Sequence, residues 1–444
     1  MKSVLVVGGG IAGLVAALLA ARKGNRVHLV ERSRECGGLL NSFRGTDDHD
    51  YDYGIHVPRE TGITSLDELL YGDLCSDEWQ RLPIIKAGAF FGGAYSDTSK
   101  FPDTNRLPKA LYEQGLAEIL RCPPGEKQGE SARDYLVHRF GATYTRCVME
   151  PASNKFYGIG LDGLAPTALL PFGLNRIIVS TPEVSRELKR SAHFDSRVAF
   201  HFSDEGQSGL AHYYPTKGGI GRWVKVLERM VETEGVTLQT GLQVESVSHD
   251  SDTIYAMTLS DGHRIEAEQF VWTVDPSILL RLTSQRAASF TPTFRTTHLY
   301  YFVVDRPFKA DSYYYVCYDQ GFRTFRTTLY SNLRSDPTER ARPSCCVEVL
   351  CDTLEAEPEA ADILQEQIGM GVIDEAAHWT LVGKKTIRRS FPVLSAEFVE
   401  TVESLKTSLA SSFDNVLLLG RASGGAFLVN DVLRQAYEEV NRRL

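Results

Sequence analysis

The chain has 444 residues, a formal net charge of −9 and 43% hydrophobic residues. This length exceeds that of one ordinary domain and suits two, with enough apolar residues for a large core. The acidic balance argues against nucleic acid as a main partner, because neutralising phosphates requires a basic field. The eight cysteines show no CxxC pair and no spacing of metal ligands, so we expect reduced thiols in a cytoplasmic protein and no metal site.

The order of elements in the first 31 residues is typical of a dinucleotide-binding βαβ unit. An apolar run predicts a buried parallel strand over Ser3–Val7, and an Ala- and Leu-rich run predicts a helix over Ile11–Lys23. A second strand is expected over Asn25–Glu31, and a glycine-rich turn joins the first strand to the helix.

Three glycines of this turn have separate physical roles. Gly8 permits the tight turn, Gly10 lets the backbone approach a pyrophosphate, and Gly13 lets the helix pack closely on the strand. The N-terminus of the helix, at Ile11 and Ala12, supplies free N–H groups and the positive end of the helix dipole. The turn therefore predicts a site for the phosphates of a dinucleotide.

An acidic residue at the end of the second strand completes the fingerprint. Glu31 follows Gly13 by 18 residues, where a carboxylate can accept hydrogen bonds from a ribose diol. Arg32 comes directly after it and is included among the cofactor-binding candidates.

The same stretch has a second interpretation. The residues Val4–Ala21 carry no charge and could also form a signal peptide or a membrane span. Three consecutive glycines within this run, and the basic Arg22 and Lys23 behind it, argue against that interpretation. We therefore expect no transmembrane segment, and a peripheral membrane contact stays open.

Helical patterns dominate from about residue 66 to 196, and they include helices expected over Ser131–Phe140 and Pro182–Ser191. A further glycine turn at residues 217–221 opens a helix expected over Arg222–Glu234. The spacing of this turn does not match a second GxGxxG, so no dedicated NAD(P)H site is visible.

Strands follow one another in the next region. A strand is expected over Thr237–Val247, and the runs Asp250–Leu259 and Arg264–Thr273 predict a hairpin with its turn at Asp261-Gly262. Four further runs predict an antiparallel sheet, and alternate tyrosines on it would line the face toward a substrate: Thr297–Val304, Ser312–Tyr318, Thr324–Asn332 and Cys345–Leu350. The end of the chain predicts a strand over Asn415–Leu419 and a closing helix over Val432–Leu444.

These elements predict an α/β protein with a discontinuous Rossmann-type domain. The nucleotide-binding domain is expected to consist of residues 1–65, 205–285 and 385–444. A substrate-binding cap of α+β type, which contains the antiparallel sheet, is expected from residues 66–204 and 286–384.

The glycine fingerprint, Glu31, Gly37-Gly38 and Gly420-Arg421 together resemble the FAD-dependent superfamily of amine oxidases, protoporphyrinogen oxidase, phytoene desaturases and UDP-galactopyranose mutase. This resemblance implies FAD as the cofactor and a glutathione-reductase-like nucleotide-binding domain. It also implies that Gly37, Gly38 and Leu39 run along the pyrophosphate or the flavin. By the same resemblance, the backbone at Val244 meets the adenine, Gly420-Arg421 lies near the ribityl chain, and Asn430-Asp431 begins the helix aimed at the flavin.

Several passages resemble the UDP-galactopyranose mutase branch most. The segment Tyr53-Gly54-Ile55-His56 is similar to its histidine loop beside the flavin, which makes Gly54 and His56 cofactor-binding candidates. The turn at Asn154–Gly158 is similar to that of the mutase substrate domain. Arg326 and Arg389 fall near arginines that, in the mutase, serve the flavin region and the sugar-nucleotide diphosphate.

Three positions depart from the mutase pattern. Phe156-Tyr157 stands where the mutase has a tryptophan before its turn glycine. Phe427 and Val429 stand where it has a tyrosine and an aspartate that help to hold the substrate diphosphate and pyranose. The architecture is therefore expected to be shared, whereas the mutase reaction itself is put in doubt.

The simplest hypothesis for the function is an FAD-dependent oxidoreductase. It would oxidise a small polar substrate, a sugar or a nucleotide-sugar being the favoured kind, by hydride transfer to flavin N5. The catalytic candidates are His56, Arg326 and Arg389. His56 could titrate near neutrality, hydrogen-bond the flavin, or merely satisfy the backbone of its loop. Dioxygen or another acceptor would then reoxidise the flavin.

Two alternatives remain at this stage. One is a non-redox, flavin-dependent nucleotide-sugar mutase, whose diphosphate cradle Arg323, Arg326, Arg388 and Arg389 could supply. The other is a flavoprotein without catalytic activity. The substrate, the electron acceptor, the catalytic base and the oligomeric state are not determined by the sequence.

Overall fold

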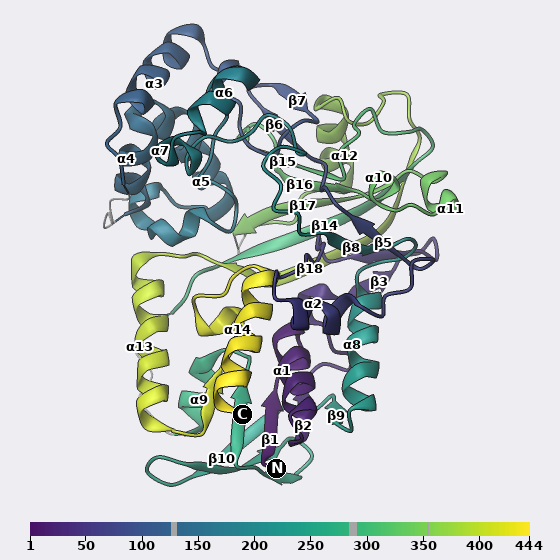
Figure 1. The fold of residues 1–444 in the computed structure, drawn as a ribbon. Helices are drawn as coiled ribbons and strands as arrows, with labels where there is room; N and C mark the ends of the chain where they lie inside the picture. The colour runs from purple at the N-terminus through teal and green to yellow at the C-terminus, as the bar shows by residue number, and fades with distance from the viewer. Residues whose placement is uncertain (126–130, 284–290, 353–354) are drawn as a thin grey trace.

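Two large sheets organise the chain in the computed structural model, which describes residues 1–125, 131–283, 291–352 and 355–444. In Figure 1 the smaller of these sheets lies in the lower part of the molecule, together with both chain termini. The larger sheet lies above it and has a group of helices at its side. No helix in the described part of the chain is long and apolar enough to cross a membrane.

The smaller sheet has five strands in the order β19-β13-β1-β2-β9, and every pairing is parallel. Its strands are β1 (Ser3–Val7), β2 (Arg26–Glu31), β9 (Thr237–Thr240), β13 (Gln269–Trp272) and β19 (Val416–Leu418). The first two strands and the helix between them, α1 (Ile11–Arg22), therefore lie within about one residue of the predicted bounds. This sheet confirms the α/β fold with a Rossmann-type core.

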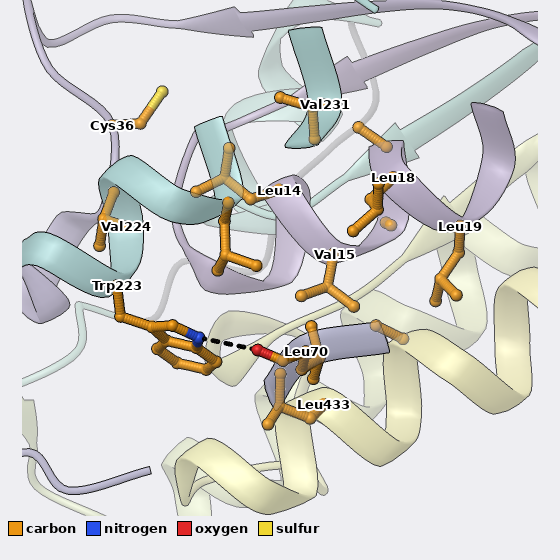
Figure 2. Packing of buried hydrophobic residues seen from close by; sticks show 14 of the residues in the cluster. Leu14, Val15, Leu18, Leu19, Cys36, Leu70, Trp223, Val224, Val231 and Leu433 are labelled. Atoms are coloured by element: carbon orange, nitrogen blue, oxygen red, sulfur yellow. Dashed lines mark hydrogen bonds between the residues drawn. The ribbon is translucent and has the colours of Figure 1, made fainter. Parts of the chain in front are cut away.

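Helix α1 is apolar on all sides because it packs between the sheet and two other helices. Every residue from Ala12 to Ala20 is buried. Its neighbours are α8 (Gly221–Thr233) and the closing helix α14 (Val429–Arg443). Figure 2 shows Leu14 and Val15 of α1 among Trp223 of α8 and Leu433 of α14. The indole N–H of Trp223 donates to the Leu70 carbonyl oxygen at 3.4 Å, so the ring is buried without losing its hydrogen bond.

The predicted strand over Thr237–Val247 is wrong as one element, because the structure divides it into two. Its first part is β9 of the parallel sheet, and its second part is β10 (Val244–His249). Gly241 lies between them at φ 76°, a conformation that suits glycine, and turns the chain. Strand β10 continues antiparallel into β11 (Ile254–Leu259) and β12 (Arg264–Glu266).

The predicted hairpin is confirmed only in part. Strands β11 and β12 pair antiparallel, as expected. The rest of the second run, however, is β13, which leaves the hairpin and pairs with β1 in the parallel sheet. The sequence pattern does not indicate this change of sheet, because strands of the antiparallel and of the parallel sheet bury the same kinds of apolar side chain.

The larger sheet has seven strands in the order β18-β14-β17-β16-β15-β6-β7. These are β6 (Ala87–Phe91), β7 (Ala94–Ser96), β14 (Phe294–Val304), β15 (Tyr314–Cys317), β16 (Thr324–Leu329), β17 (Ser344–Asp352) and β18 (Trp379–Pro392). The four predicted antiparallel strands are thus present as β14 to β17. Strand β18 runs through residue 385 and stays paired with β14 as far as Pro392, beyond the domain boundary that the sequence predicts.

Residues 66–196 are less helical than their pattern predicts. They contain β6 and β7, and also β5 (Trp79–Leu82), which pairs with β8 (His212–Pro215). Strand β6 pairs in parallel with β15, more than 200 residues later in the chain. Such distant pairing leaves no local signal, which explains why these strands were not predicted.

The remaining elements surround the two sheets. The hairpin of β3 (Ser42–Arg44) and β4 (Asp50–Asp52) stands alone as a two-stranded sheet. The helices of the first half are α2 (Thr64–Tyr71), α3 (Lys109–Arg121), α4 (Ala132–Tyr144), α5 (Glu150–Tyr157), α6 (Pro182–Leu188) and α7 (Ala192–Asp195). Those of the second half are α9 (Pro276–Leu282), α10 (Tyr330–Leu333), α11 (Pro337–Arg340), α12 (Ala360–Gly369) and α13 (Ala396–Ser412).

Asp52, the last residue of β4, joins the parts that carry the two large sheets. The residue is 1% exposed, and hydrogen bonds join it to Ser42, Tyr214, Ile220, Tyr301 and Tyr330. Its carboxylate accepts the N–H of Ile220, before α8, at 2.7 Å. Its carbonyl oxygen accepts the hydroxyl of Tyr301, on β14, at 2.7 Å. One buried residue thus ties the start of α8 to the seven-stranded sheet.

We predict that Asp52→Ala lowers the free energy of unfolding by about 3 kcal/mol or more, because three buried donors lose their acceptor. The urea midpoint of the purified protein measures this loss. The control is Asp48→Asn, which removes a carboxylate that is 84% exposed and pairs with Arg44 but keeps a side chain tolerated at φ 65°, and which should change stability by less than about 0.5 kcal/mol. Equal effects of the two substitutions would contradict the role of Asp52.

Candidate functional site

The glycine turn between β1 and α1 has the geometry of a phosphate-binding loop. Gly8 has φ 106°, and its N–H donates to the Val30 carbonyl oxygen at 2.8 Å. A Cβ at Gly13 would overlap the Gly8 carbonyl oxygen, so only glycine allows this close packing. At Gly10, by contrast, a Cβ would point into open space. The backbone at Gly10 is therefore open to a phosphate group, as the fingerprint predicts.

The second predicted glycine turn lies directly on the first. The N–H of Gly37 donates to the Gly9 carbonyl oxygen at 2.8 Å, and Gly10 and Gly37 form an isolated parallel bridge. A Cβ at Gly38 would lie 3.9 Å from the Gly10 Cα atom. Leu39 follows, half-buried. The fold therefore brings the two turns together, although the sequence separates them.

Glu31 stands at the end of β2 beside the glycine turn. Its two carboxylate oxygens accept the N–H groups of Gly9 and Ser33, each at 2.7 Å. Each oxygen keeps a further lone pair with which to accept a hydroxyl group. Arg32 is exposed. The carboxylate is thus held in place by the backbone and fits the predicted role toward a ribose.

The segment before β10 lies beside Glu31. The N–H of Gly241 donates to the Ser33 carbonyl oxygen at 2.8 Å, and the N–H of Leu242 donates to the Glu31 carbonyl oxygen at 3.0 Å. Val244 begins β10 two residues later and is half-buried. This arrangement fits the predicted contact of Val244 with an adenine next to the ribose.

The turn near the end of the chain reaches the start of α1. A Cβ at Gly420 would lie 3.2 Å from the Cβ of Ala12, and Ile11 packs with Ala12, Ala426 and Val432. Helix α14 begins at Val429, three residues earlier than predicted. The three glycine motifs that carry the resemblance therefore converge on one edge of the parallel sheet.

Two candidates in the first turn of α14 already have protein partners. The Asn430 amide donates to the Glu60 carbonyl oxygen at 3.0 Å. The Asp431 carboxylate accepts the Leu428 N–H at 3.0 Å and thereby caps the N-terminus of the helix. Both residues thus position this helix, and contacts with the cofactor remain a prediction for them.

These residues fit an FAD molecule. The open backbone at Gly10 suits a pyrophosphate, and the anchored Glu31 suits the adenosine ribose. When bound, FAD would supply an acceptor for two electrons, delivered as a hydride.

The charges of two arginines, Arg326 and Arg421, act on the imidazole of His56, and we call these three residues the cationic cluster. Partial burial lowers the pKa of His56 to about 3, and the nearby charges of the two guanidinium groups add to the shift. The imidazole is therefore neutral at physiological pH, which contradicts the expectation that it could titrate near neutrality. It can donate or accept one hydrogen bond at each nitrogen, but it cannot hold a positive charge.

One member of this cluster, Arg326, forms a buried ion pair with Glu348. The Nε and one terminal nitrogen of Arg326 donate to the two carboxylate oxygens of Glu348, at 2.6 and 2.8 Å. Glu348 is 2% exposed, and a Cβ at Gly54 would lie 2.7 Å from one of its oxygens. Glycine at position 54 thus lets the histidine loop approach the carboxylate.

Sequence reasoning missed Glu348. Glu348 is the one charged residue in the buried run from Ser344 to Cys351 of strand β17. A single carboxylate within such a run is a readable signal, because a buried charge needs a partner. The partner, Arg326, lies on the adjacent strand β16.

Arg421 differs from Arg326 because no carboxylate among the described residues pairs with it. Its guanidinium lies 4.5 Å from the ring centre of Phe427 and 5.7 Å from that of Phe391. One terminal nitrogen donates weakly to the Ser390 carbonyl oxygen at 3.5 Å. Burial lowers the pKa of Arg421. Phe427, at the position where the sequence comparison expects the mutase tyrosine, thus packs near the guanidinium of Arg421.

Arg389 has other neighbours. Its side chain is 60% exposed, lies 4.2 Å from the ring centre of Phe294 and approaches Asp275 at 4.0 Å. Its φ of 57° is unusual for a residue with a side chain. The charge of Arg326 acts on His56, whereas the described interactions of Arg389 are with Phe294 and Asp275, and a catalytic role of Arg389 stays a prediction.

The tyrosines of the larger sheet are mainly structural. Tyr300, Tyr301 and Tyr315 are buried, and each hydroxyl is bound within the protein, for instance Tyr300 to the Pro358 carbonyl oxygen at 2.6 Å. The expected tyrosine-lined substrate face is thus not what these residues form.

Comparisons with known proteins agree with this geometry. Residues 6–65 match the sequence model of the NAD(P)-binding Rossmann-like domain, and residues 165–356 match that of the flavin containing amine oxidoreductases. The 4,4'-diaponeurosporene oxygenase of Staphylococcus aureus (strain MRSA252) is 24% identical over 316 residues, which cover 64% of this chain and 59% of that protein. The chain thus spans about three fifths of the length of the curated relatives it matches.

Solved structures extend the similarity of the fold to the whole chain. Reduced UDP-galactopyranose mutase superposes with a TM-score of 0.79 at 16% identity, covering 100% of this chain and 95% of that one. A putative protoporphyrinogen oxidase from Exiguobacterium sp. 255-15 has a TM-score of 0.68 at 16% identity, covering 99% and 98%. The resemblance to this FAD-dependent superfamily is confirmed, and the family match supports FAD as the cofactor.

We predict opposite effects for two glycine substitutions in the first turn. Gly10→Ala should leave the cofactor-free protein as stable as the wild type, to within about 0.5 kcal/mol, but weaken FAD binding about tenfold or more. Gly13→Ala should destabilise the protein even without cofactor, because its Cβ overlaps the Gly8 carbonyl group.

Thermal unfolding of the cofactor-free proteins and titration with FAD measure both effects. A Gly10→Ala protein that binds FAD with unchanged affinity would contradict the placement of the pyrophosphate.

We predict that His56 does not ionise between pH 8 and pH 5, because its pKa lies near 3. The unfolded chain binds a proton near the ordinary pKa of 6.5, so this residue costs stability as the pH falls from about 6.5 toward 3. Replacement by asparagine, His56→Asn, should therefore reduce the loss of stability over this range. The imidazole signals of His56 in NMR, assigned with that variant, check the charge state, and a midpoint near pH 6.5 would refute it.

Proposed function

We propose that this protein is an FAD-dependent oxidoreductase that takes a hydride from a small polar substrate. The observation that carries this proposal is the cluster of His56, Arg326 and Arg421, in which Arg421 pairs with no carboxylate of the described residues. The family match to flavin containing amine oxidoreductases supports the reaction class.

The charges of the cluster favour a polar or anionic substrate. Glu348 neutralises Arg326, so the net charge of the group is that of Arg421. The guanidinium of Arg421 lies near the rings of Phe391 and Phe427 and offers several N–H donors in one plane. Arg421 is therefore placed to bind an oxygen-rich or negatively charged group of the substrate or of the cofactor.

His56 would orient the reacting group of the substrate by a hydrogen bond and would not act as the general base that takes up its proton. A neutral imidazole can accept a hydrogen bond from a hydroxyl or an amine, which aligns the neighbouring C–H bond. Its low pKa makes it a weak base, so the proton must leave by way of another group or water.

The relatives suggest two competing substrate classes. The name 4,4'-diaponeurosporene oxygenase would point to a long apolar polyene. The name UDP-galactopyranose mutase would point to a nucleotide-sugar and to a reaction without net oxidation. Arg421 is partly buried and pairs with no carboxylate in the part of the chain that the structure describes, which favours the polar class over the polyene.

The proposal is tested by following the absorbance of the bound flavin near 450 nm, about its usual position, under anaerobic conditions. The holoprotein is mixed in turn with sugars, nucleotide-sugars, primary amines and a solubilised polyene. Bleaching by a polar compound supports the proposal. Bleaching by the polyene alone, or by none of the compounds, contradicts it. Turnover of a nucleotide-sugar only after reduction with dithionite, without net redox change, would establish the mutase reaction instead.

We predict that Arg421→Met weakens the binding of the substrate that bleaches the flavin by about 10- to 100-fold, the effect of one lost charge-assisted hydrogen bond. The dependence of the bleaching rate on substrate concentration measures this. Arg190→Met removes an exposed guanidinium at the surface and is the matched control, with an unchanged dependence. If both variants behave as the wild type, Arg421 does not contact the substrate. The FAD content of each variant, measured first, distinguishes loss of cofactor from loss of substrate binding.

A further inference from the structure

Lys155 and Cys317 form a second reactive pair, which the proposed flavin chemistry does not use. Lys155 lies in the last turn of α5, and Cys317 is the last residue of β15. The Nζ of Lys155 lies 3.3 Å from the Sγ of Cys317 and donates to the carbonyl oxygens of Cys317 and Asp319, both at 2.9 Å. The amine and the thiol are thus held in contact across 162 residues of sequence.

The surroundings favour the reactive form of the amine. Burial lowers the pKa of Lys155, which increases the share of neutral amine, the nucleophilic form. Cys317 is 0% exposed, and burial raises the pKa of its thiol while the neighbouring lysine opposes that rise.

A small molecule can reach the pair from one side. Lys155 borders a cavity of about 360 Å³, whose other polar lining residues include Asn154, Gln320 and Arg323. Lys155 is half-buried, whereas Cys317 is 0% exposed and does not line the cavity. We therefore expect a small neutral oxidant such as dioxygen or peroxide to reach the thiol more readily than a bulky thiol reagent.

We propose that Lys155 and Cys317 are an oxidative modification site, at which dioxygen or hydrogen peroxide joins them through an S–O–N bridge. With dioxygen, the thiol and the neutral amine together lose four electrons. One oxygen atom enters the bridge and the other leaves as water, which takes up the one hydrogen lost by the thiol and the one lost by the amine. With peroxide, two molecules are consumed and three molecules of water are released. Four electrons from a dithiol reductant reverse the reaction and return the thiol, the amine and one water.

The bridge would join two parts of the cap covalently. Helix α5 packs in the helical cluster that includes Phe156 and Tyr157, whereas Cys317 belongs to the core of the seven-stranded sheet. A link between residues this distant in sequence restricts the unfolded chain, so the oxidised protein should unfold at a higher temperature. The oxidation state of the surroundings could thus set the rigidity of the cap.

The test uses the full-length wild-type protein, treated with hydrogen peroxide and analysed by intact mass and peptide mapping. We expect a gain of about 14 Da, the mass of one oxygen less two hydrogens, and a cross-linked peptide pair that contains Lys155 and Cys317. A dithiol reductant should remove the gain. If Cys317 instead gains about 16 or 32 Da, enters a disulfide, or does not react at all, the proposal is overturned.

Three variants support the assignment of the bridge. Cys317→Ser and Lys155→Arg should each abolish the gain of about 14 Da, because each lacks one partner of the bridge. Cys75→Ser removes an exposed free thiol and should retain it. The wild-type peptide map decides the proposal even if one of these variants fails to fold, and a bridge retained in Lys155→Arg would contradict it.

Discussion

The structure depends on the burial of one carboxylate, that of Asp52, between its two large sheets. Its side chain binds the start of α8 in the nucleotide-binding part, and its backbone binds Tyr301 and Tyr330 of the seven-stranded sheet. Burial raises the pKa of Asp52, and the hydroxyls of Tyr214 and Ser42 counter part of that cost. His56 follows only four residues later, so the constraint that joins the two parts also positions the histidine loop.

The charged groups of the candidate site are paired in part. Glu348 compensates Arg326, Arg421 has no carboxylate partner among the described residues, and the charges of the two guanidinium groups help to keep the imidazole of His56 neutral. An anionic or oxygen-rich ligand would therefore complete the cluster by meeting Arg421. The convergence of the glycine turns at Gly10, Gly37 and Gly420 on one sheet edge provides the complementary half of the site, suited to FAD.

Local patterns predict the first elements of the parallel sheet well and the distant strand pairings poorly. The glycine turn, β1, β2 and α1 follow from periodicity and from the steric needs of Gly8 and Gly13, which are local properties. Strands β6 and β7 depend on pairing with β15 far along the chain, and the break at Gly241 depends on a change of sheet. The partnership of Arg326 with Glu348 is likewise set by the register of two neighbouring strands, which the sequence does not contain in readable form.

The most direct test of this account is the identity and amount of the cofactor in the purified protein. We expect visible absorption bands at about 375 and 450 nm, and release on denaturation of FAD in a ratio of about one molecule per chain. A colourless protein that takes up no FAD on titration, but binds a nicotinamide dinucleotide through the same glycine turn, would contradict the account.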